Sequence, residues 1–351
     1  MRFLFFVAAI LSPAYLYLGL RLGNHWSHWL LLALLFLLII SFPLKKLFPL
    51  QIQLAYAGMG FLTYLVVFTL VRDVAWFLTG DLAPISYVFI LTVVSLVIGV
   101  INASRGPRIK RVRVPVNDLN EKLNGLKIAQ ISDLHVGATI RKRYVEKVVK
   151  KVNALKSDIV VLTGDIGDGN VREYRQDIAP IGNLKSSYGS FFVPGNHEYY
   201  WNANEWLIVL NNLGTINLVN RGKIIKHNEA NVLVAGIPDP VSRLAPNLDT
   251  KYAEDAFKIL LSHRPGIAPE AEKNGFHLLL SGHTHGGQFF PWTIVVKFVH
   301  KLSQGLHRVG NMWVYVNPGT GSWGPLLRLG TTPEITLLEL VRSSEIKLIN
   351  E

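Results

Sequence analysis

Five short apolar runs, each of strand length, lead into Asp, Asn or His residues, and this repeated pattern constrains the fold more than any other feature of the sequence. The runs are Leu126–Ile131, Asp158–Leu162, Ser190–Val193, Lys258–Leu261 and Leu278–Leu280. Short continuous apolar runs are typical of strands buried inside a sheet. Open α/β sheets carry their ligand sites at the carboxyl ends of such strands. We therefore expect an α/β fold in which the residues after these runs converge on one edge.

The residues that follow the runs are of types whose side chains commonly bind metals in proteins. They are Asp133 and His135, then Asp165 and Asp168, then Asn196 and His197, then His263, and finally His283 and His285. A single Asp or His at a strand end is more often a cap or a turn residue than a ligand, but that explanation does not extend to the whole set. The chain contains no Cys, so no thiolate site or disulfide framework is expected. Carboxylate, amide oxygen and imidazole ligands suit Mn, Fe or Zn.

These blocks resemble the calcineurin-like metallophosphoesterase family. The motifs DxH, GDxxD, GNH followed by Glu, a lone His and GHxH all occur in the order that the family has, from about Leu126 to the C-terminus. The resemblance implies an α/β sandwich of two sheets flanked by helices. It also implies a site with two metal ions, one held by Asp133, His135, Asp165 and His285, and the other by Asp165, Asn196, His263 and His283, with Asp165 as the bridge.

The resemblance further implies a reaction and roles for other residues. Two ions about 3.5–4 Å apart lower the pKa of a bridging water, and the resulting metal-bridging hydroxide attacks a phosphoester. His197 would protonate the leaving oxygen, Asp168 would fix the tautomer of His197, and Asn196 would also contact the substrate. Asp168, flanked by two glycines, has the alternative of merely shaping a turn. Gly195 is expected to let the Asn196–His197 turn form without strain.

Periodicity predicts several further elements of the catalytic domain. Residues 108–116 are expected to form an edge strand, since Pro115 is tolerated only at an edge. Amphipathic spacing predicts a helix at Arg141–Lys156 with a valine stripe facing the core, and a shorter helix at Asn204–Asn212. Strands are predicted at Asn231–Ala235, Met312–Val316 and Glu334–Leu340.

Residues 1–104 have a different composition, because they contain only seven charged side chains: Arg2, Arg21, Lys45, Lys46, Arg72, Asp73 and Asp81. Four apolar segments approach the roughly 20 residues that cross a bilayer as a helix. They run approximately over Phe3–Leu20, Trp29–Leu44, Gln53–Val71 and Ile85–Asn102. The first segment has the alternative of a signal peptide, although it lacks a convincing cleavage site. We expect four membrane spans, with the end of the third ambiguous around Arg72–Asp73.

The distribution of Lys and Arg predicts the orientation of these spans. One side carries Arg2, Lys45, Lys46, Arg105, Arg108, Lys110, Arg111 and Arg113, whereas the other carries Arg21 and Arg72. The basic side is expected to be cytoplasmic, so an even number of spans places both termini and the catalytic domain in the cytoplasm. Gly106–Pro107 interrupts the chain. We therefore predict a transmembrane helical domain at residues 1–104 and a metallophosphoesterase domain at residues 105–351.

An apolar stretch at Phe289–Leu302 immediately follows the HxH block. One interpretation is a segment that dips into the membrane interface, with Lys297 and Lys301 toward the headgroups. The alternative is a helix that covers the sheet or packs on the membrane domain. Arg328 is a candidate substrate-binding residue that clamps a phosphate, with a solvated surface arginine as its alternative.

Together these features predict a multi-pass membrane protein that hydrolyses a phosphoester with two divalent ions, with a membrane lipid as partner. The preferred substrate is a lipid phosphodiester or pyrophosphate. The alternatives are a soluble nucleotide or phosphoprotein substrate, or a membrane scaffold without catalysis. The net charge of +12 does not indicate a nucleic-acid partner, since the sequence carries no recognition motif and no aromatic platform for bases.

Overall fold

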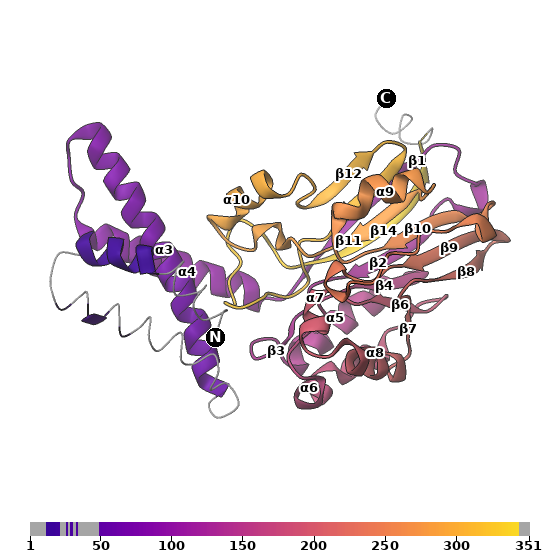
Figure 1. The fold of residues 1–351 in the computed structure, drawn as a ribbon, viewed down its shortest axis with the longest axis horizontal. Helices are drawn as coiled ribbons and strands as arrows, with labels where there is room; N and C mark the ends of the chain where they lie inside the picture. Colours follow the sequence, from indigo (N-terminus) through magenta and orange to yellow (C-terminus); the bar gives the residue numbers. More distant parts are fainter. Residues whose placement is uncertain (1–11, 22–25, 27–28, 31–32, 34–48, 344–351) are drawn as a thin grey trace. The chain divides into compact units, whose positions relative to one another are not determined.

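The computed structural model describes residues 12–21, 26, 29–30, 33 and 49–343 (Figure 1). The chain divides into two compact units. The helical unit comprises Met1–Ser104 and the distant segment Gly324–Leu329, and the catalytic unit comprises Arg105–Trp323 and Gly330–Glu351. The chain therefore leaves the catalytic unit once, at residues 324–329, before returning to its last strand.

The described part of the helical unit contains two long apolar helices, α3 (Pro49–Thr79) and α4 (Ile85–Ser104). Both are long and apolar enough to cross a membrane, and they correspond to the third and fourth predicted spans. The first two predicted spans lie largely outside the described residues, although residues 12–21 are helical. Two candidate membrane helices are therefore found in the described part of the chain, where the sequence predicted four spans overall.

Helix α3 continues past Arg72 and Asp73, which settles the end of the third predicted span. Asp73 accepts an ion pair from Arg21 at 2.8 Å. The Nε atom of Arg72 donates to the carbonyl oxygen of Ala83 at 2.7 Å. Because both charged side chains have polar partners, the helix continues through them to Thr79.

The segment Gly324–Leu329 packs among the helices of its own unit. An added Cβ atom at Gly60 would lie 2.4 Å from Cδ1 of Leu327, and one at Gly99 would lie 3.1 Å from Cδ2 of the same side chain. The backbone N–H of Arg328 donates to the carbonyl oxygen of Gly99 at 3.0 Å. The absence of side chains at the two glycines thus makes room for Leu327. The domain boundary predicted at residue 104 did not include this segment in the helical domain.

Two six-stranded sheets form the catalytic unit. The first sheet has, in spatial order, β1 (Arg108–Val116), β14 (Glu334–Arg342), β2 (Lys127–Ile131), β4 (Ile159–Thr163), β6 (Ser190–Val193) and β7 (Thr215–Asn217). The second has β12 (Gly305–Val309), β13 (Met312–Val316), β11 (Leu278–Ser281), β10 (Phe257–Leu261), β9 (Ala230–Gly236) and β8 (Arg221–His227). A small third sheet pairs β3 (Val136–Gly137) with β5 (Gly167–Asp168). β1 lies at an edge, as Pro115 predicted.

Strands that precede the site run parallel within each sheet. β2, β4 and β6 are parallel neighbours in the first sheet, and β10 and β11 are parallel neighbours in the second. Their carboxyl ends therefore lie at the same end of each sheet. The prediction of one edge was incomplete, because three of the five strand ends belong to one sheet and two to the other.

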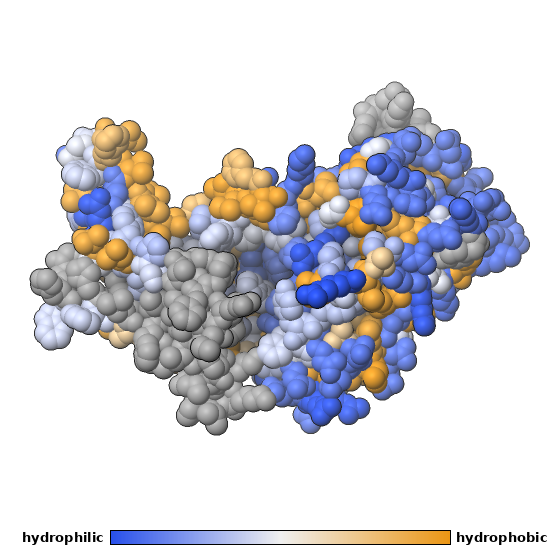
Figure 2. Space-filling model, in the orientation of Figure 1, coloured by the Kyte–Doolittle hydropathy of each residue, from blue (hydrophilic) through white to orange (hydrophobic). Residues whose placement is uncertain are grey.

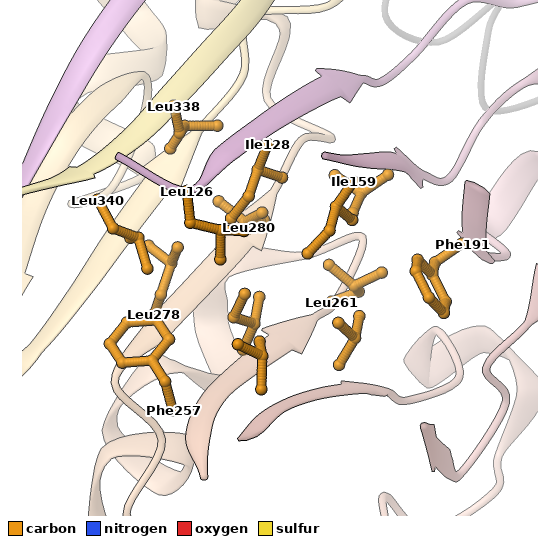
Figure 3. Packing of buried hydrophobic residues seen from close by; sticks show 14 of the residues in the cluster. Leu126, Ile128, Ile159, Phe191, Phe257, Leu261, Leu278, Leu280, Leu338 and Leu340 are labelled. Carbon is orange, nitrogen blue, oxygen red and sulfur yellow. The ribbon is translucent and has the colours of Figure 1, made fainter. Parts of the chain in front are cut away.

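The main core lies between the two sheets, where side chains of both inner faces meet (Figure 3). Ile128, Ile159 and Phe191 from the first sheet pack in one cluster with Leu261 and Leu280 from the second, and all are essentially inaccessible to solvent. Burying a side chain of this size contributes roughly 1.5–3 kcal/mol. This packing holds the two sets of strand ends in a fixed relation.

Helices connect the strands of the catalytic unit. They are α5 (Lys142–Ala154), α6 (Val171–Ile178), α7 (Asn196–Tyr200), α8 (Ala203–Asn212), α9 (Ala268–Lys273) and α10 (Trp292–Val299). Short 3₁₀ turns occur at η1 (Glu121–Leu123), η2 (Ala179–Asn183), η3 (Pro240–Ser242), η4 (Lys251–Ala253), η5 (Pro265–Ile267) and η6 (His285–Gly287). The predicted helices correspond to α5 and α8, and the predicted later strands to β9, β13 and β14. The valine stripe of α5 is buried as expected.

Candidate metal centre

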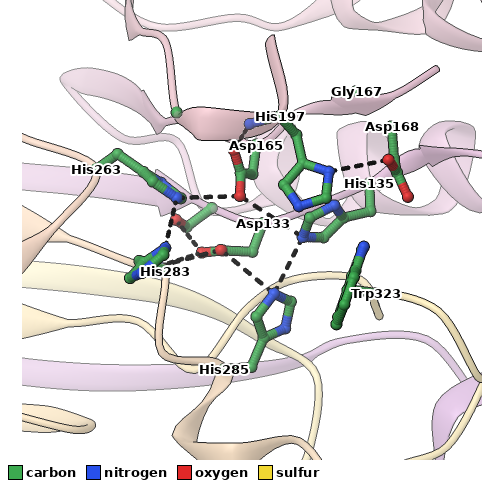
Figure 4. Close-up of polar contacts among 12 residues, drawn as sticks. Asp133, His135, Asp165, Gly167, Asp168, His197, His263, His283, His285 and Trp323 are labelled. Carbon is green, nitrogen blue, oxygen red and sulfur yellow. Dashed lines mark hydrogen bonds and ion pairs between the residues drawn. The ribbon is translucent and has the colours of Figure 1, made fainter. Parts of the chain in front are cut away.

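The ends of β2, β4, β6, β10 and β11 bring the predicted polar side chains together (Figure 4). Three groups of potential ligand atoms each lie within 4.8 Å of one another. They are Asp133, His135 and His285; Asp165, His263 and His283; and His135, Asp168 and His197. The first two groups correspond to the two ligand sets that the family resemblance implied.

Asp165 belongs to the second group and also faces the first. Its Oδ2 atom is 3.0 Å from Nε2 of His263 and 4.0 Å from Nε2 of His135. Its Oδ1 atom accepts the backbone N–H of His197 at 2.8 Å. One oxygen of this carboxylate therefore faces both imidazole groups, which is the geometry that a bridging ligand needs.

Pairs of imidazole nitrogens approach each other within each group. Nε2 of His135 lies 3.0 Å from Nε2 of His285, and Nδ1 of His283 lies 3.2 Å from Nε2 of His263. The other ring nitrogen of His263 lies 2.9 Å from the carbonyl oxygen of Thr163. An Nδ1–H donor there leaves the lone pair on Nε2, and a hydrogen bond of this kind commonly orients a metal-binding histidine.

The amide of Asn196 gives an independent test of whether the site fits a cation. Asn196 is 5% exposed, and its Oδ1 atom has no hydrogen-bond partner among the described residues. Buried polar atoms are nearly always hydrogen-bonded, so such an oxygen calls for an explanation. Together with neighbouring imidazole and carboxylate groups, it completes a donor set that suits Mn, Fe or Zn.

Five of the candidate ligands have left-handed backbone conformations. Their φ angles are +50° at Asp133, +54° at His135, +52° at Asp165, +72° at His283 and +52° at His285. Each such conformation costs of the order of 1 kcal/mol and persists only where the surrounding structure requires it. This concentration at one place marks a functional site.

Buried charge in the centre favours a cation. Burial lowers the pKa values of His135 and His283 to about 3, so both rings are neutral at pH 7, as metal ligands must be. Burial alone would lower the pKa of His263 as well, but the carboxylate of Asp165 raises it to about 10. Burial raises the pKa of Asp133 to about 6. The buried carboxylates therefore attract positive charge, which a proton or a metal ion can supply.

The side chain of His197 is held by Asp168 on the more open side of the centre. Its Nδ1 atom lies 2.9 Å from Oδ1 of Asp168, and Nε1–H of Trp201 donates to the same oxygen at 3.2 Å. Burial alone would lower the pKa of His197, but this hydrogen bond and the charge of Asp165 raise it. His197 and Asp168 retain 12% and 16% side-chain exposure, whereas Asp133 and Asp165 are buried. The His197–Asp168 pair is therefore more accessible to solvent than the two buried carboxylates.

Glu198 is a positioning residue that the sequence did not identify. It is fully buried, and its carboxylate accepts the backbone N–H groups of Asp165, Gly167 and Gly195 at 2.7–2.9 Å. Its position after the GNH block was visible, but its partners come from two separate loops.

Gly195 also differs from expectation: its φ of −97° needs no glycine. An added Cβ atom there would lie 2.2 Å from Oδ1 of Asp165, so close approach is what requires the glycine.

Trp323 is a second residue that the sequence did not identify. Its ring lies 5.8 Å from that of His197 in an edge arrangement, and the residue is 47% exposed. The side chain of Gln288 holds its backbone, since Gln288 Oε1 accepts the N–H and Nε2 donates to the carbonyl oxygen, both at 2.8 Å. Trp323 thus forms part of the open side of the site.

Arg328 belongs to the helical unit and its side chain is fully buried. The alternative of a solvated surface arginine is therefore wrong, and the role of Arg328 as a phosphate clamp stays a prediction.

The fold and donor set together define a protein with a centre for two metal ions. The family described as calcineurin-like phosphoesterase matches residues 126–287. A protein of Danio rerio named transmembrane protein with metallophosphoesterase domain is 35% identical over 278 residues, which are 75% of this chain and 64% of the relative. An uncharacterized metallophosphoesterase of Campylobacter jejuni is 34% identical over 266 residues, which are 72% of this chain and 68% of the relative. One of Aquifex aeolicus is 32% identical over 229 residues, 61% and 85% of the two chains.

The chain belongs to the calcineurin-like metallophosphoesterase family. Its cofactors are accordingly two divalent metal ions, and the carboxylate and imidazole groups described above are able to hold them. The matched region spans slightly less than two thirds of the length of the Danio rerio relative.

Proposed function

We propose that this protein is a membrane-anchored hydrolase that cleaves a phosphoester with the help of two divalent metal ions. The observation that carries the proposal is the position of Asp165, whose Oδ2 atom faces His263 on one side and His135 on the other. One ion would be held by Asp133, His135, Asp165 and His285, and the other by Asp165, Asn196, His263 and His283. When bound, the ions activate water at neutral pH and stabilise the charge that develops on the phosphoryl group.

The chain's own residues divide the remaining work. Asp168 accepts a hydrogen bond from Nδ1 of His197, which leaves Nε2 of that ring for the substrate. Against the effect of burial, the hydrogen bond to Asp168 and the charge of Asp165 raise the pKa of His197, which favours the protonated ring that a general acid needs. His197 would donate its Nε2 proton to the oxygen that leaves phosphorus, so a diester releases a neutral alcohol and a pyrophosphate releases a phosphate with one negative charge fewer. Trp323, beside His197, would limit access of bulk water.

The preferred substrate is a lipid phosphodiester or pyrophosphate. Two apolar helices that are long enough to cross a membrane support a place at the bilayer, and the Danio rerio relative is named a transmembrane protein. A chain anchored in this way meets membrane lipids at high local concentration. We propose a multi-pass protein with its catalytic unit in the cytoplasm, because Lys and Arg gather in the flanks on one side of the spans.

A comparison of matched substrates tests this proposal. The full-length protein would be reconstituted in nanodiscs with Mn²⁺ and supplied with a phosphodiester on a membrane lipid or with the water-soluble headgroup diester. Faster turnover of the lipid is the expected result, and metal chelation should abolish both reactions. Faster turnover of the soluble diester would contradict the lipid assignment, and turnover of neither across nucleotide, protein and lipid substrates would contradict a hydrolase.

A further inference from the structure

Helix α10 presents an unusually apolar surface for a helix outside the membrane spans. None of its eight residues is buried within the described part of the chain. Phe298 is 85% exposed, Val299 67% and Ile294 50%. Figure 2 shows this helix as a hydrophobic patch on the catalytic unit. The interpretation that the segment covers the sheet is therefore wrong, and contiguous exposed apolar patches generally mark an interaction site.

The charges around this patch are of one sign. Lys297 lies within α10 and Lys301 lies two residues beyond its end, and both are exposed. Residues 287–311 contain no Asp or Glu. Trp292 at the start of the helix is 48% exposed. Aromatic and aliphatic side chains flanked by lysines are the composition of a helix that lies in a membrane interface and is attracted to anionic lipids.

The end of α10 connects this patch to the metal centre. A cavity of about 320 Å³ is lined by Val299, His300, Lys301 and Leu302 together with Pro265 and Pro269. The ring of His300 lies 6.2 Å from the ring of His283. Apolar side chains line most of the cavity, and His300 is the lining residue that lies beside a candidate ligand. A lipid held at α10 would thus have an apolar space at the end of the helix where His300 lies near His283.

We propose that α10 inserts into the interface of an anionic lipid bilayer, with Ile294 and Phe298 among the acyl chains and with Lys297 and the following Lys301 at the headgroups. The proposal rests on the proposed attachment to a membrane and deepens the proposed lipid specificity, but it does not depend on hydrolysis. We assign a bilayer to this patch for two reasons. The patch is flanked by lysines, and the same chain carries two helices long enough to cross a membrane.

Single-cysteine probes test the insertion directly, since the chain has no native Cys. Phe298→Cys in the full-length protein would carry an environment-sensitive fluorophore in nanodiscs that contain phosphatidylglycerol. The matched control is Ile208→Cys on α8, which is also an exposed apolar position, with 60% exposure. We expect quenchers in the acyl chains to reduce the Phe298 signal at least about twofold, with little effect at Ile208, and aqueous iodide to do the reverse.

Two results would overturn the proposal. Iodide quenching at Phe298 as strong as at Ile208 would show that α10 faces water. Protection from both quenchers would show that protein covers the patch, whether another part of this chain or a second copy. Lys297→Glu with Lys301→Glu should reduce acyl-chain quenching, and an unchanged signal would contradict the attraction to anionic lipid. Because the fluorescence needs no turnover, an inserted probe on an inactive protein would refute only the proposed hydrolysis.

Discussion

Nδ1 of His197 lies 2.9 Å from Oδ1 of Asp168, and this contact joins the start of α7 to the small strand β5. The contact fixes which nitrogen of the imidazole faces the open side of the metal centre. The ring of His197 also lies edge-on to that of His135, with 4.7 Å between the ring centroids, so the proposed proton donor stands beside a candidate metal ligand.

Replacing His197 by alanine should affect substrates according to their leaving groups. His197→Ala is expected to reduce kcat by about 10²- to 10⁴-fold for a diester with an alkyl leaving group, which needs a proton to depart. A p-nitrophenyl diester should lose much less, because its leaving group is stable as an anion. Steady-state kinetics with both substrates measures the difference. Equal losses for the two would contradict proton donation by His197.

Asp168→Asn distinguishes a positioning carboxylate from a residue that only shapes a turn. Asparagine preserves the turn preference but not the charge, so a loss of about 10- to 100-fold in kcat is expected if Asp168 orients His197. Asp168 also helps to raise the pKa of His197. A general acid loses activity as pH rises through its pKa, so the alkaline limb of the pH–rate profile should move to lower pH in the variant. Unchanged activity and an unchanged profile would favour the turn-shaping alternative.

Glu198→Gln should destabilise the catalytic unit. The buried carboxylate accepts three backbone N–H groups, and a glutamine would direct its own N–H₂ group at some of them. The expected loss is about 1–3 kcal/mol in the free energy of unfolding, measured by thermal or denaturant unfolding. Glu205→Gln is the matched control, because Glu205 lies on α8 and its ion pair with Arg172 is partly exposed to solvent. Equal stability of the two variants would contradict the positioning role of Glu198.

The packing of Leu327 against two glycines predicts an unusual sign for a helix substitution. Gly→Ala inside a helix normally stabilises by about 0.5–1 kcal/mol. Gly60→Ala should instead destabilise the helical unit, because the new methyl group would lie 2.4 Å from Leu327. Leu327→Ala in the same protein should remove much of that penalty. Thermal unfolding in detergent measures the coupling, and additive effects of the two substitutions would contradict the contact.

The five strands beneath the site were predictable because each is a continuous apolar run buried on both faces. β8 was not predicted, since most of its residues are exposed and it carries no clear alternation. The two ligand groups were placed through the family resemblance, and the structure then brought them together. Two of the three backbone groups bound by Glu198 come from the segment after β4, more than 30 residues away. Residues 324–329 join the helical unit through the packing of Leu327 beside two glycines and a backbone hydrogen bond to Gly99. Both are tertiary effects that local sequence patterns do not record.

The metal content of the full-length protein tests the central claim most directly. Protein purified in detergent would be incubated with Mn²⁺ or Zn²⁺, freed of unbound metal and measured by mass spectrometry of the elements. Asp165→Asn replaces one oxygen of the shared carboxylate by an NH₂ group and removes its negative charge. Asp249→Asn on an exposed loop is the matched control. We expect about two ions per chain in the native protein and in the control, and fewer than about one in Asp165→Asn. A native protein that binds neither metal, or an Asp165→Asn variant that retains both ions, would contradict the account.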